Sequence, residues 1–341
     1  MMRVLFFYAL LGLTLGSACS STPPPKAGTA GDDRDLPEAT DSTRDPLLLA
    51  DPTIFFDEGI YYLYGTHAVN KGFEVYTSRD LKNWEKQSRL ALAKQDAYGD
   101  HGFWAPQVFK YQGRYYMAYT ANEHIAIASS DSPLGPFRQQ KQQPIRDPEG
   151  LKNIDPFVFI DADGSKYLYY VRLKDGNRIY MAELQDDFSD IKTETVTSCV
   201  NAVDDPQPWE NRAEKSWTVT EGPTVLKKDG TYYLFYSGNG FRSIYYALGY
   251  ATAKTPAGPW TKYAANPILD KNLIGANGPG HGDFFQDPEG QYYYVFHTHY
   301  SAQEINPRKT ALIKGAFVKD SSQLDRMQLD ADSFYFLTDQ P

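Results

Sequence analysis

The feature that most constrains this chain is an internal repeat that occurs five times. Each copy begins with an apolar, strand-like segment, passes through a turn that contains Gly, and continues into a Tyr-rich segment. The copies begin at Asp51, Trp104, Asp155, Glu221 and His281 and lead to Gly59, Gly113, Gly164, Gly230 and Gly290. Intervals of roughly 50 to 67 residues suit one four-stranded sheet per copy. The repeat therefore predicts an all-β fold, a five-bladed β-propeller, over residues 45–341.

The local sequence supports strands rather than helices. Segments rich in aromatic and β-branched residues are separated by Gly and Asp turns, and helical periods are almost absent. The turns Asp57-Glu58-Gly59 and Lys228-Asp229-Gly230 suit hairpins, because Gly adopts a positive φ at little cost. A third strand-like segment also repeats, at residues 73–78, 125–130 and 246–252.

The first residues of the five copies differ in chemistry, although the strands around them are alike. Aligned on the turn glycines, the residue eight or nine places earlier is Asp51, Trp104, Asp155, Glu221 or His281. The innermost strand of a propeller blade begins close to the central axis, so we expect these side chains to converge on one axial pocket. Three carboxyl groups, an imidazole and an indole suit acid–base chemistry on a polar ring compound.

Composition excludes several other classes of protein. The 341 residues include 34 Lys and Arg against 43 Asp and Glu, and the formal charge of −9 has the wrong sign for a nucleic-acid binder. Two Cys cannot form a disulfide scaffold or a four-thiolate zinc site. The Gly-rich Ser237-Gly238-Asn239-Gly240 is not followed by a helical pattern, so a nucleotide-binding loop is not indicated.

The N-terminus has the composition of a secretory signal peptide over residues 1–18. An apolar run from Val4 to Leu15 is followed by small residues and then by Cys19. This order resembles bacterial lipoproteins, in which such a Cys becomes the lipidated first residue. Residues 19–44 have no hydrophobic period and predict a flexible tether. We therefore expect a secreted lipoprotein, in the periplasm or at the cell surface, that touches the membrane only through its lipid; ordinary secretion is the alternative.

The repeat motifs together resemble glycoside hydrolase family 43, which consists of five-bladed propellers that act on arabinose-, xylose- and galactose-containing glycans. The resemblance rests, in chain order, on Asp51-Pro52, Trp104-Ala105-Pro106, Asp155-Pro156, Glu221-Gly222-Pro223 and Gly280-His281-Gly282. It implies an inverting hydrolase in which Asp51 is the general base and Glu221 the general acid, while Asp155 modulates the pKa of the acid and positions it.

The resemblance also implies how the sugar is held. His281 is expected beneath the sugar, close to a structural calcium ion at the propeller axis that it would bind through water. Trp104 is expected to stack on the sugar ring or wall it, and Arg308 is similar to a family arginine that binds sugar hydroxyls. The chemistry itself requires no cofactor.

The favoured function is release of terminal α-L-arabinofuranosyl or related pentose residues from plant-type polysaccharides or oligosaccharides by a monomer. β-Xylosidase, endo-arabinanase and galactan- or galactofuranoside-directed activities of the same family are alternatives. A non-catalytic, surface glycan-binding lipoprotein is the alternative of another class. The set Asp51, Asp155 and Glu221 argues against it, because binding alone does not need a separated acid and base.

Overall fold

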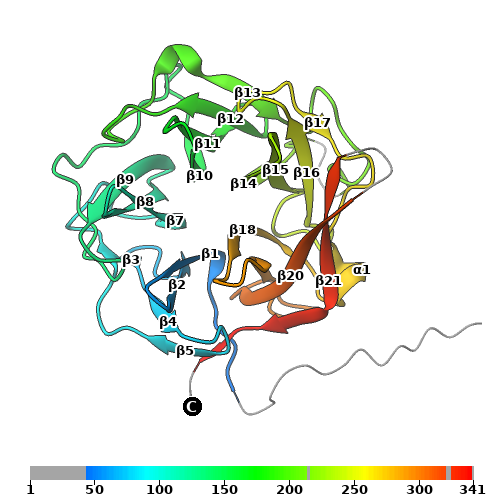
Figure 1. Ribbon diagram of the computed structural model, residues 1–341, viewed down its shortest axis with the longest axis horizontal. Helices are drawn as coiled ribbons and strands as arrows, with labels where there is room; N and C mark the ends of the chain where they lie inside the picture. Colours follow the sequence, from blue (N-terminus) through cyan, green and yellow to red (C-terminus); the bar gives the residue numbers. More distant parts are fainter. Residues whose placement is uncertain (1–43, 213–215, 320–323, 340–341) are drawn as a thin grey trace, which may run out of the picture. The chain divides into compact units, whose positions relative to one another are not determined.

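The computed structural model describes residues 44–212, 216–319 and 324–339, which form five blades around a central axis (Figure 1). The predicted all-β, five-bladed β-propeller is confirmed. The predicted signal peptide, lipidated Cys19 and the tether up to residue 43 lie outside the described residues. Within those described ranges no helix is long and apolar enough to cross a membrane.

The inner strand of every blade is the first in sequence, and the chain runs outward from it. Blade 1 contains β1 (Ala50–Asp57), β2 (Ile60–Thr66), β4 (Tyr76–Ser78) and β5 (Asn83–Lys86). Blade 2 contains β7 (Trp104–Tyr111), β8 (Arg114–Ala121) and β9 (His124–Ser130). Blade 3 contains β10 (Asn153–Ile160), β11 (Lys166–Leu173), β12 (Asn177–Glu183) and β13 (Thr197–Val200). Blade 4 contains β14 (Thr220–Lys228), β15 (Thr231–Gly238), β16 (Ala247–Ala253) and β17 (Thr261–Lys262). Blade 5 contains β18 (Gly280–Gln286), β19 (Tyr292–Thr298), β20 (Lys309–Lys319) and β21 (Asp325–Phe336).

Short elements complete the described chain. Strands β3 (Gly72–Phe73) and β6 (Leu92–Ala93) pair with each other, and a 3₁₀ turn covers Thr193–Thr195. Helix α1 (Lys271–Ile274) is one turn long, and Asp270 caps it by accepting hydrogen bonds from the peptide N–H groups of Asn272 and Leu273.

The expectation of four strands per blade is wrong for two blades. Blade 2 has three strands in the described chain, and a single bridge between Ser129 and Arg138 extends its outer edge. The connecting segment contains Pro133 and Pro136, which lack the peptide N–H that a strand ladder requires. Blade 1 gains a fifth strand, because β22 (Thr338–Asp339) pairs in parallel with β5. That pairing closes the ring of blades within one sheet.

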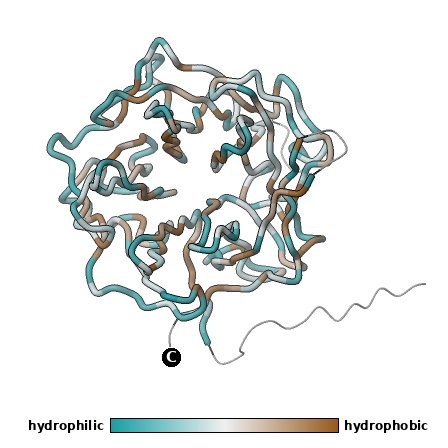
Figure 2. The backbone as a smooth tube through the Cα atoms, in the orientation of Figure 1, coloured by the Kyte–Doolittle hydropathy of each residue, from teal (hydrophilic) through white to brown (hydrophobic). Residues whose placement is uncertain are grey.

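The apolar core is divided into five clusters, one at each junction between neighbouring blades. Successive residues of a strand point into different clusters: in β15, Tyr232 and Leu234 face blade 3, whereas Tyr233 and Phe235 face blade 5. Both faces of the strand are buried, and its sequence is therefore a continuous run of mostly apolar residues instead of an alternation of apolar and polar ones. Apolar segments accordingly lie in the blades, and the outer loops are mostly hydrophilic (Figure 2).

Every inner strand begins with the same irregularity in its pairing to the second strand of its blade. The register shifts between Ala50 and Thr53 in blade 1 and at the matching place in the other four blades. One residue at each shift has a positive φ: Asp51 (49°), Ala105 (46°), Asp155 (56°), Gly222 (58°) and His281 (41°). Four of these five residues are not Gly, so four blades hold a residue in a backbone conformation that L-residues avoid.

The strained peptides are joined to the neighbouring blade by a ring of hydrogen bonds. The N–H groups of Ala105, Asp155 and His281 donate to hydroxyl oxygens on the second strand of the preceding blade. These acceptors are Thr66 (2.8 Å), Thr120 (3.0 Å) and Ser237 (2.8 Å). The N–H of Asp51 donates to His297 Nδ1 at 3.1 Å. In blade 3 the corresponding second-strand residue is Val171, which has no acceptor atom in its side chain, and the N–H of Gly222 donates instead to Asp155 Oδ2 at 3.3 Å.

This register corrects the sequence alignment of the five copies. Trp104 and Glu221 lie one position before the residue with the positive φ, whereas Asp51, Asp155 and His281 are that residue itself. Neighbouring residues of a regular strand point to opposite faces, but a bulge re-aims the chain. All five side chains can therefore reach one end of the axis although they come from two successive positions.

Replacing Thr66 by Val tests the contribution of the ring. The buried N–H of Ala105 would lose its acceptor with little change in side-chain shape, and the free energy of unfolding should fall by about 1–3 kcal/mol. Urea denaturation measures the change. Thr261→Val, at an exposed position of β17, is the control. Equal midpoints for the two variants would contradict a stabilising role for the ring.

Candidate active site

All six predicted site residues line one cavity at the end of the axis where the inner strands begin. They are Asp51, Trp104, Asp155, Glu221, His281 and Arg308, and the cavity has a volume of about 780 Å³. This size lies within the range of about 300–1,000 Å³ that is usual for small-molecule sites. The bulges bring the first five residues together, and Arg308 enters from the connection between β19 and β20.

Asp51 is a buried carboxylate surrounded by nitrogen atoms. Arg308 donates to its Oδ1 at 3.0 Å, and the Nδ1 atoms of His281 and His297 both lie 3.3 Å from the same oxygen. Burial by itself would raise the pKa of Asp51, but the charge of Arg308 is the leading opposing cause and the pKa falls well below its usual range. Asp51 is therefore ionised at neutral pH.

Glu221 is the opposite case within the same cavity. It is buried, it lies one position before a bulge residue, and both carboxyl oxygens have a donor: Tyr246 Oη at 2.8 Å from Oε1 and Asn177 Nδ2 at 2.8 Å from Oε2. Burial and the charge of Asp51 outweigh these donors and raise the pKa of Glu221 to about 7. Near neutral pH this side chain can hold and release a proton.

Asp155 interacts electrostatically with both of the other carboxyl groups. Its Oδ2 accepts from the N–H of Gly222, the residue directly after Glu221, at 3.3 Å. Burial and repulsion by Glu221 and Asp51 raise its pKa well above the ordinary value. The sequence assigned the raised pKa of Glu221 partly to the charge of Asp155; in the structure, burial is the first cause and Asp51 is the charge that raises it.

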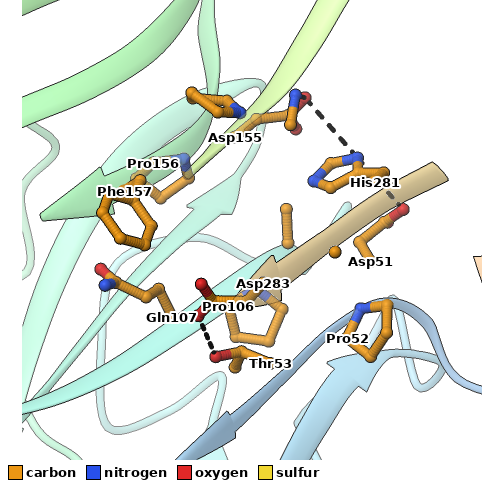
Figure 3. A pocket seen from close by; sticks show the side chains of 14 residues that line it. Asp51, Pro52, Thr53, Pro106, Gln107, Asp155, Pro156, Phe157, His281 and Asp283 are labelled. Carbon is orange, nitrogen blue, oxygen red and sulfur yellow. Dashed lines mark hydrogen bonds and ion pairs between the residues drawn. The ribbon is translucent and has the colours of Figure 1, made fainter. Parts of the chain in front are cut away.

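His281 stands between two carboxyl groups. Its Nδ1 lies 3.3 Å from Asp51 Oδ1 and 3.9 Å from Asp155 Oδ2 (Figure 3). Burial lowers the pKa of this imidazole. The ring also packs against Gly222, where an added Cβ would lie 2.7 Å from His281 Cδ2. This close approach leaves no room for a side chain at position 222, and Gly adopts the positive φ there without strain.

Three residues that contact the carboxyl groups of Asp51 and Glu221 were not predicted from the sequence: His297, Tyr246 and Asn177. His297 is completely buried and stacks on Tyr246, with ring centroids 5.7 Å apart. The same tyrosine donates to Glu221, so one packed pair connects the surroundings of both carboxyl groups. An alignment of the second strands would have identified His297, since it occupies the position where three other blades have Thr or Ser. We find no comparable signal for Tyr246 or Asn177.

A second, smaller cavity continues along the axis beneath His281. Its volume is about 20 Å³, enough for about one water molecule. Asp283 lies in its wall and accepts a hydrogen bond from Thr53 at 2.7 Å (Figure 3). Its other carboxyl oxygen accepts one from Thr224 at 2.8 Å, so Asp283 joins blade 5 to blades 1 and 4. Burial raises the pKa of Asp283 to about 6.

The side chains around the axis bear on the calcium ion that was expected there. No group of three or more His, Cys, Asp or Glu within the described ranges is arranged to hold a metal ion. Calcium prefers six to eight oxygen ligands, and these side chains do not fit an ion ligated directly by the protein. An ion bound through water below His281 stays a prediction, which elemental analysis of the purified protein would check, and no chemical step below depends on it.

Comparisons with known proteins agree with this architecture. A family model described as Glycosyl hydrolases family 43 matches residues 46–322. The crystal structure of an endo-1,4-beta-xylanase from Bacteroides thetaiotaomicron is 41% identical, with a TM-score of 0.80 over 88% of this chain and 99% of that one. A β-D-galactofuranosidase of Aspergillus niger is 23% identical over 82% of each chain. An extracellular endo-α-(1→5)-L-arabinanase of Thermotoga petrophila is 27% identical over 74% of this chain and 65% of its own length.

Replacing Arg308 by Met should raise the pKa of Asp51 toward or above its ordinary value, because burial then acts without its main counter-charge. Carbon-13 NMR titration of the aspartate carboxyl groups measures the shift, with Asp51→Asn to identify the signal. Arg114→Met, at a half-exposed arginine of β8, is the control. An unchanged titration of Asp51 in the Arg308 variant would contradict the assigned cause.

Proposed function

Because this chain belongs to glycosyl hydrolase family 43 and is therefore an enzyme that hydrolyses glycosidic bonds, we propose that it removes terminal α-L-arabinofuranosyl or related pentose residues from plant-type glycans. The reaction would invert the anomeric configuration, with Glu221 as general acid and Asp51 as general base. A carbohydrate substrate follows from the family, whereas the sugar and the roles of individual residues are our proposals.

The observation that supports the catalytic roles is the opposite state of two carboxyl groups in one cavity. Glu221 has a pKa raised to about 7 by burial and by the charge of Asp51. Asp51 is buried as well, but the Arg308 guanidinium keeps it ionised. An inverting hydrolase needs one protonated and one ionised carboxyl group on opposite sides of the sugar.

The proposed reaction needs only these groups and water. Glu221 gives its proton to the glycosidic oxygen as the bond between that oxygen and the anomeric carbon breaks. Asp51 takes a proton from the water molecule that attacks the anomeric carbon from the opposite face. Glu221 ends ionised and Asp51 protonated, and proton exchange with solvent restores both. The sugar is released with inverted configuration.

Asp155 is proposed to position the acid rather than to exchange protons with the substrate. Its carboxyl group accepts from the peptide N–H that follows Glu221, so it fixes the backbone beside the acid. Trp104 and His281 line the cavity and would contact the sugar. Arg308 keeps Asp51 ionised through a 3.0 Å hydrogen bond and could also meet sugar hydroxyls.

Cleavage of xylose-containing chains is the second candidate. Its support is the solved relative at 41% identity, which is described as an endo-1,4-beta-xylanase. The cavity of about 780 Å³ has room for more than one sugar ring, which suits action on a chain as well as on its end. Hydrolysis of galactofuranosides, the activity named for the Aspergillus relative, is a third candidate, and the same panel of substrates tests it.

We further propose that the enzyme is secreted as a monomer and anchored by a lipid on Cys19. The support is the sequence of residues 1–19 together with the extracellular location named for the Thermotoga relative. Mass spectrometry of the mature protein should find Cys19 as the lipidated first residue, and Cys19→Ser should release the protein from the membrane fraction. A mature N-terminus beyond Cys19 would exclude the anchor.

The catalytic roles are tested by comparing Asp51→Ala and Glu221→Ala on two kinds of substrate. Nitrophenolate leaves without much acid help, so Glu221→Ala should keep part of its activity on nitrophenyl glycosides and lose polysaccharide cleavage about 10²–10⁴-fold. Asp51→Ala should lose both activities. The panel contains α-L-arabinofuranoside, β-D-xyloside and β-D-galactofuranoside with arabinan, arabinoxylan and galactan.

Asp131→Ala, whose carboxyl group is almost fully exposed on the surface, is the control for this panel. Proton NMR of the first product detects the anomeric configuration, and retention would contradict the inverting mechanism. Full activity in both active-site variants would contradict the assignment of the acid and the base. Glycan binding by the wild-type protein without turnover would favour the binding-protein alternative.

A further inference from the structure

Trp217 is an exposed aromatic side chain on the wall of the active-site cavity. It is the most exposed large hydrophobic residue of the described chain, with 43% of its surface accessible. Large aromatic rings at the mouth of a site are usually contact surfaces for a ligand.

Trp217 is connected to the proposed acid through a single side chain. Its indole N–H donates to Asn177 Oδ1 at 2.8 Å, and Asn177 Nδ2 donates to Glu221 Oε2 at 2.8 Å. An indole nitrogen can only donate, so the asparagine must present its oxygen to Trp217 and its NH₂ to Glu221. The tryptophan thereby fixes which way the amide points.

The segment that carries Trp217 is held against the start of β12. The N–H of Asn177 donates to the carbonyl oxygen of Thr218 at 2.9 Å, and the hydroxyl of Thr220 donates back to the carbonyl of Asn177 at 3.0 Å. Gly176 allows this approach, since an added Cβ would lie 2.6 Å from the Thr218 oxygen. The backbone on both sides of the Trp217–Asn177 hydrogen bond is therefore fixed.

The position of Trp217 identifies the part of the substrate that it would meet. The general acid protonates the oxygen between the cleaved sugar and the leaving group, so the leaving group lies on the Glu221 side of the cavity. Trp217 is two hydrogen bonds from Glu221, whereas Asp51 is surrounded by Arg308 and two histidines. An indole face on that side matches the C–H face of a sugar ring, and the cavity has room for this second ring.

We propose that Trp217 determines specificity for the leaving group: its ring is the platform for a sugar unit on the acid side of the cleaved bond, and its N–H holds Asn177 against Glu221. This inference rests on the proposed role of Glu221 as the general acid. Trp217 selects glycans in which the released pentose is attached to another sugar ring, and it contributes little when the leaving group has no ring.

Two variants separate the ring from the N–H. Trp217→Ala removes both, whereas Trp217→Phe keeps an aromatic ring and removes the donor. The substrates are methyl α-L-arabinofuranoside, whose leaving group has no ring, and α-1,5-arabinobiose, or the methyl glycoside and disaccharide of whichever sugar the panel identifies. Both substrates need the acid, but only the disaccharide can use a platform.

We expect Trp217→Ala to lower kcat/KM on the disaccharide about tenfold more than on the methyl glycoside, mainly through KM. Trp217→Phe should keep most of the disaccharide preference. In both variants the alkaline limb of the pH profile should move to higher pH. Burial raises the pKa of Glu221 and the Asn177 donor opposes this rise, so a freed amide leaves the acid protonated to higher pH.

Tyr300→Ala is the matched control, since Tyr300 is 38% exposed and does not line the cavity. If Trp217→Ala lowers kcat/KM equally on both substrates, so that the preference for the disaccharide is unchanged, the ring is not a platform for the leaving group. An alkaline limb that stays in place in Trp217→Phe would overturn the link through Asn177. Asp51→Ala and Glu221→Ala variants that both keep the hydrolytic activity of the wild-type enzyme would instead overturn the proposed function. The two failures are therefore distinguishable.

Discussion

The propeller depends on a residue with a positive φ at the start of each inner strand and on the hydrogen bond that links it to the preceding blade. The positive φ at these positions is unfavourable for L-residues, and it occurs in blade 2 at Ala105, a residue with no reactive side chain. The strain is therefore a property of the architecture. Because the N–H groups point across the blade junctions, the ring defines the axial end of the domain and the place where functional side chains gather.

Two contacts of the candidate active site lie where this ring departs from its Thr and Ser pattern. His297 replaces the hydroxyl acceptor between blades 5 and 1, and it brings a neutral imidazole next to Asp51. Val171 cannot accept a hydrogen bond, and the carboxyl group of Asp155 takes over that function for Gly222. His297 and Asp155 thus contribute both to the stability of the blade junctions and to the chemistry of the cavity. A substitution of either residue should affect stability and activity together.

One scaffold gives two carboxyl groups opposite properties through their neighbours. Both Asp51 and Glu221 are buried, so desolvation pushes both toward the neutral form. Arg308 reverses this for Asp51, whereas Glu221 has only neutral donors, and the charge of Asp51 adds to the effect of burial. The proposed base therefore helps to keep the proposed acid protonated, which makes Arg308 important for both groups.

The sequence alone determined the repeat, the five blades and six of the residues that line the cavity, because strand patterns and turn glycines recur at a regular interval. It misplaced Trp104 and Glu221 by one position, since a bulge changes the side-chain alternation without leaving a clear signal in composition. Tyr246, Asn177 and Trp217 became visible only in the tertiary structure. Their roles come from contacts between segments far apart in the chain, and such contacts are decided by packing between blades rather than by local pattern.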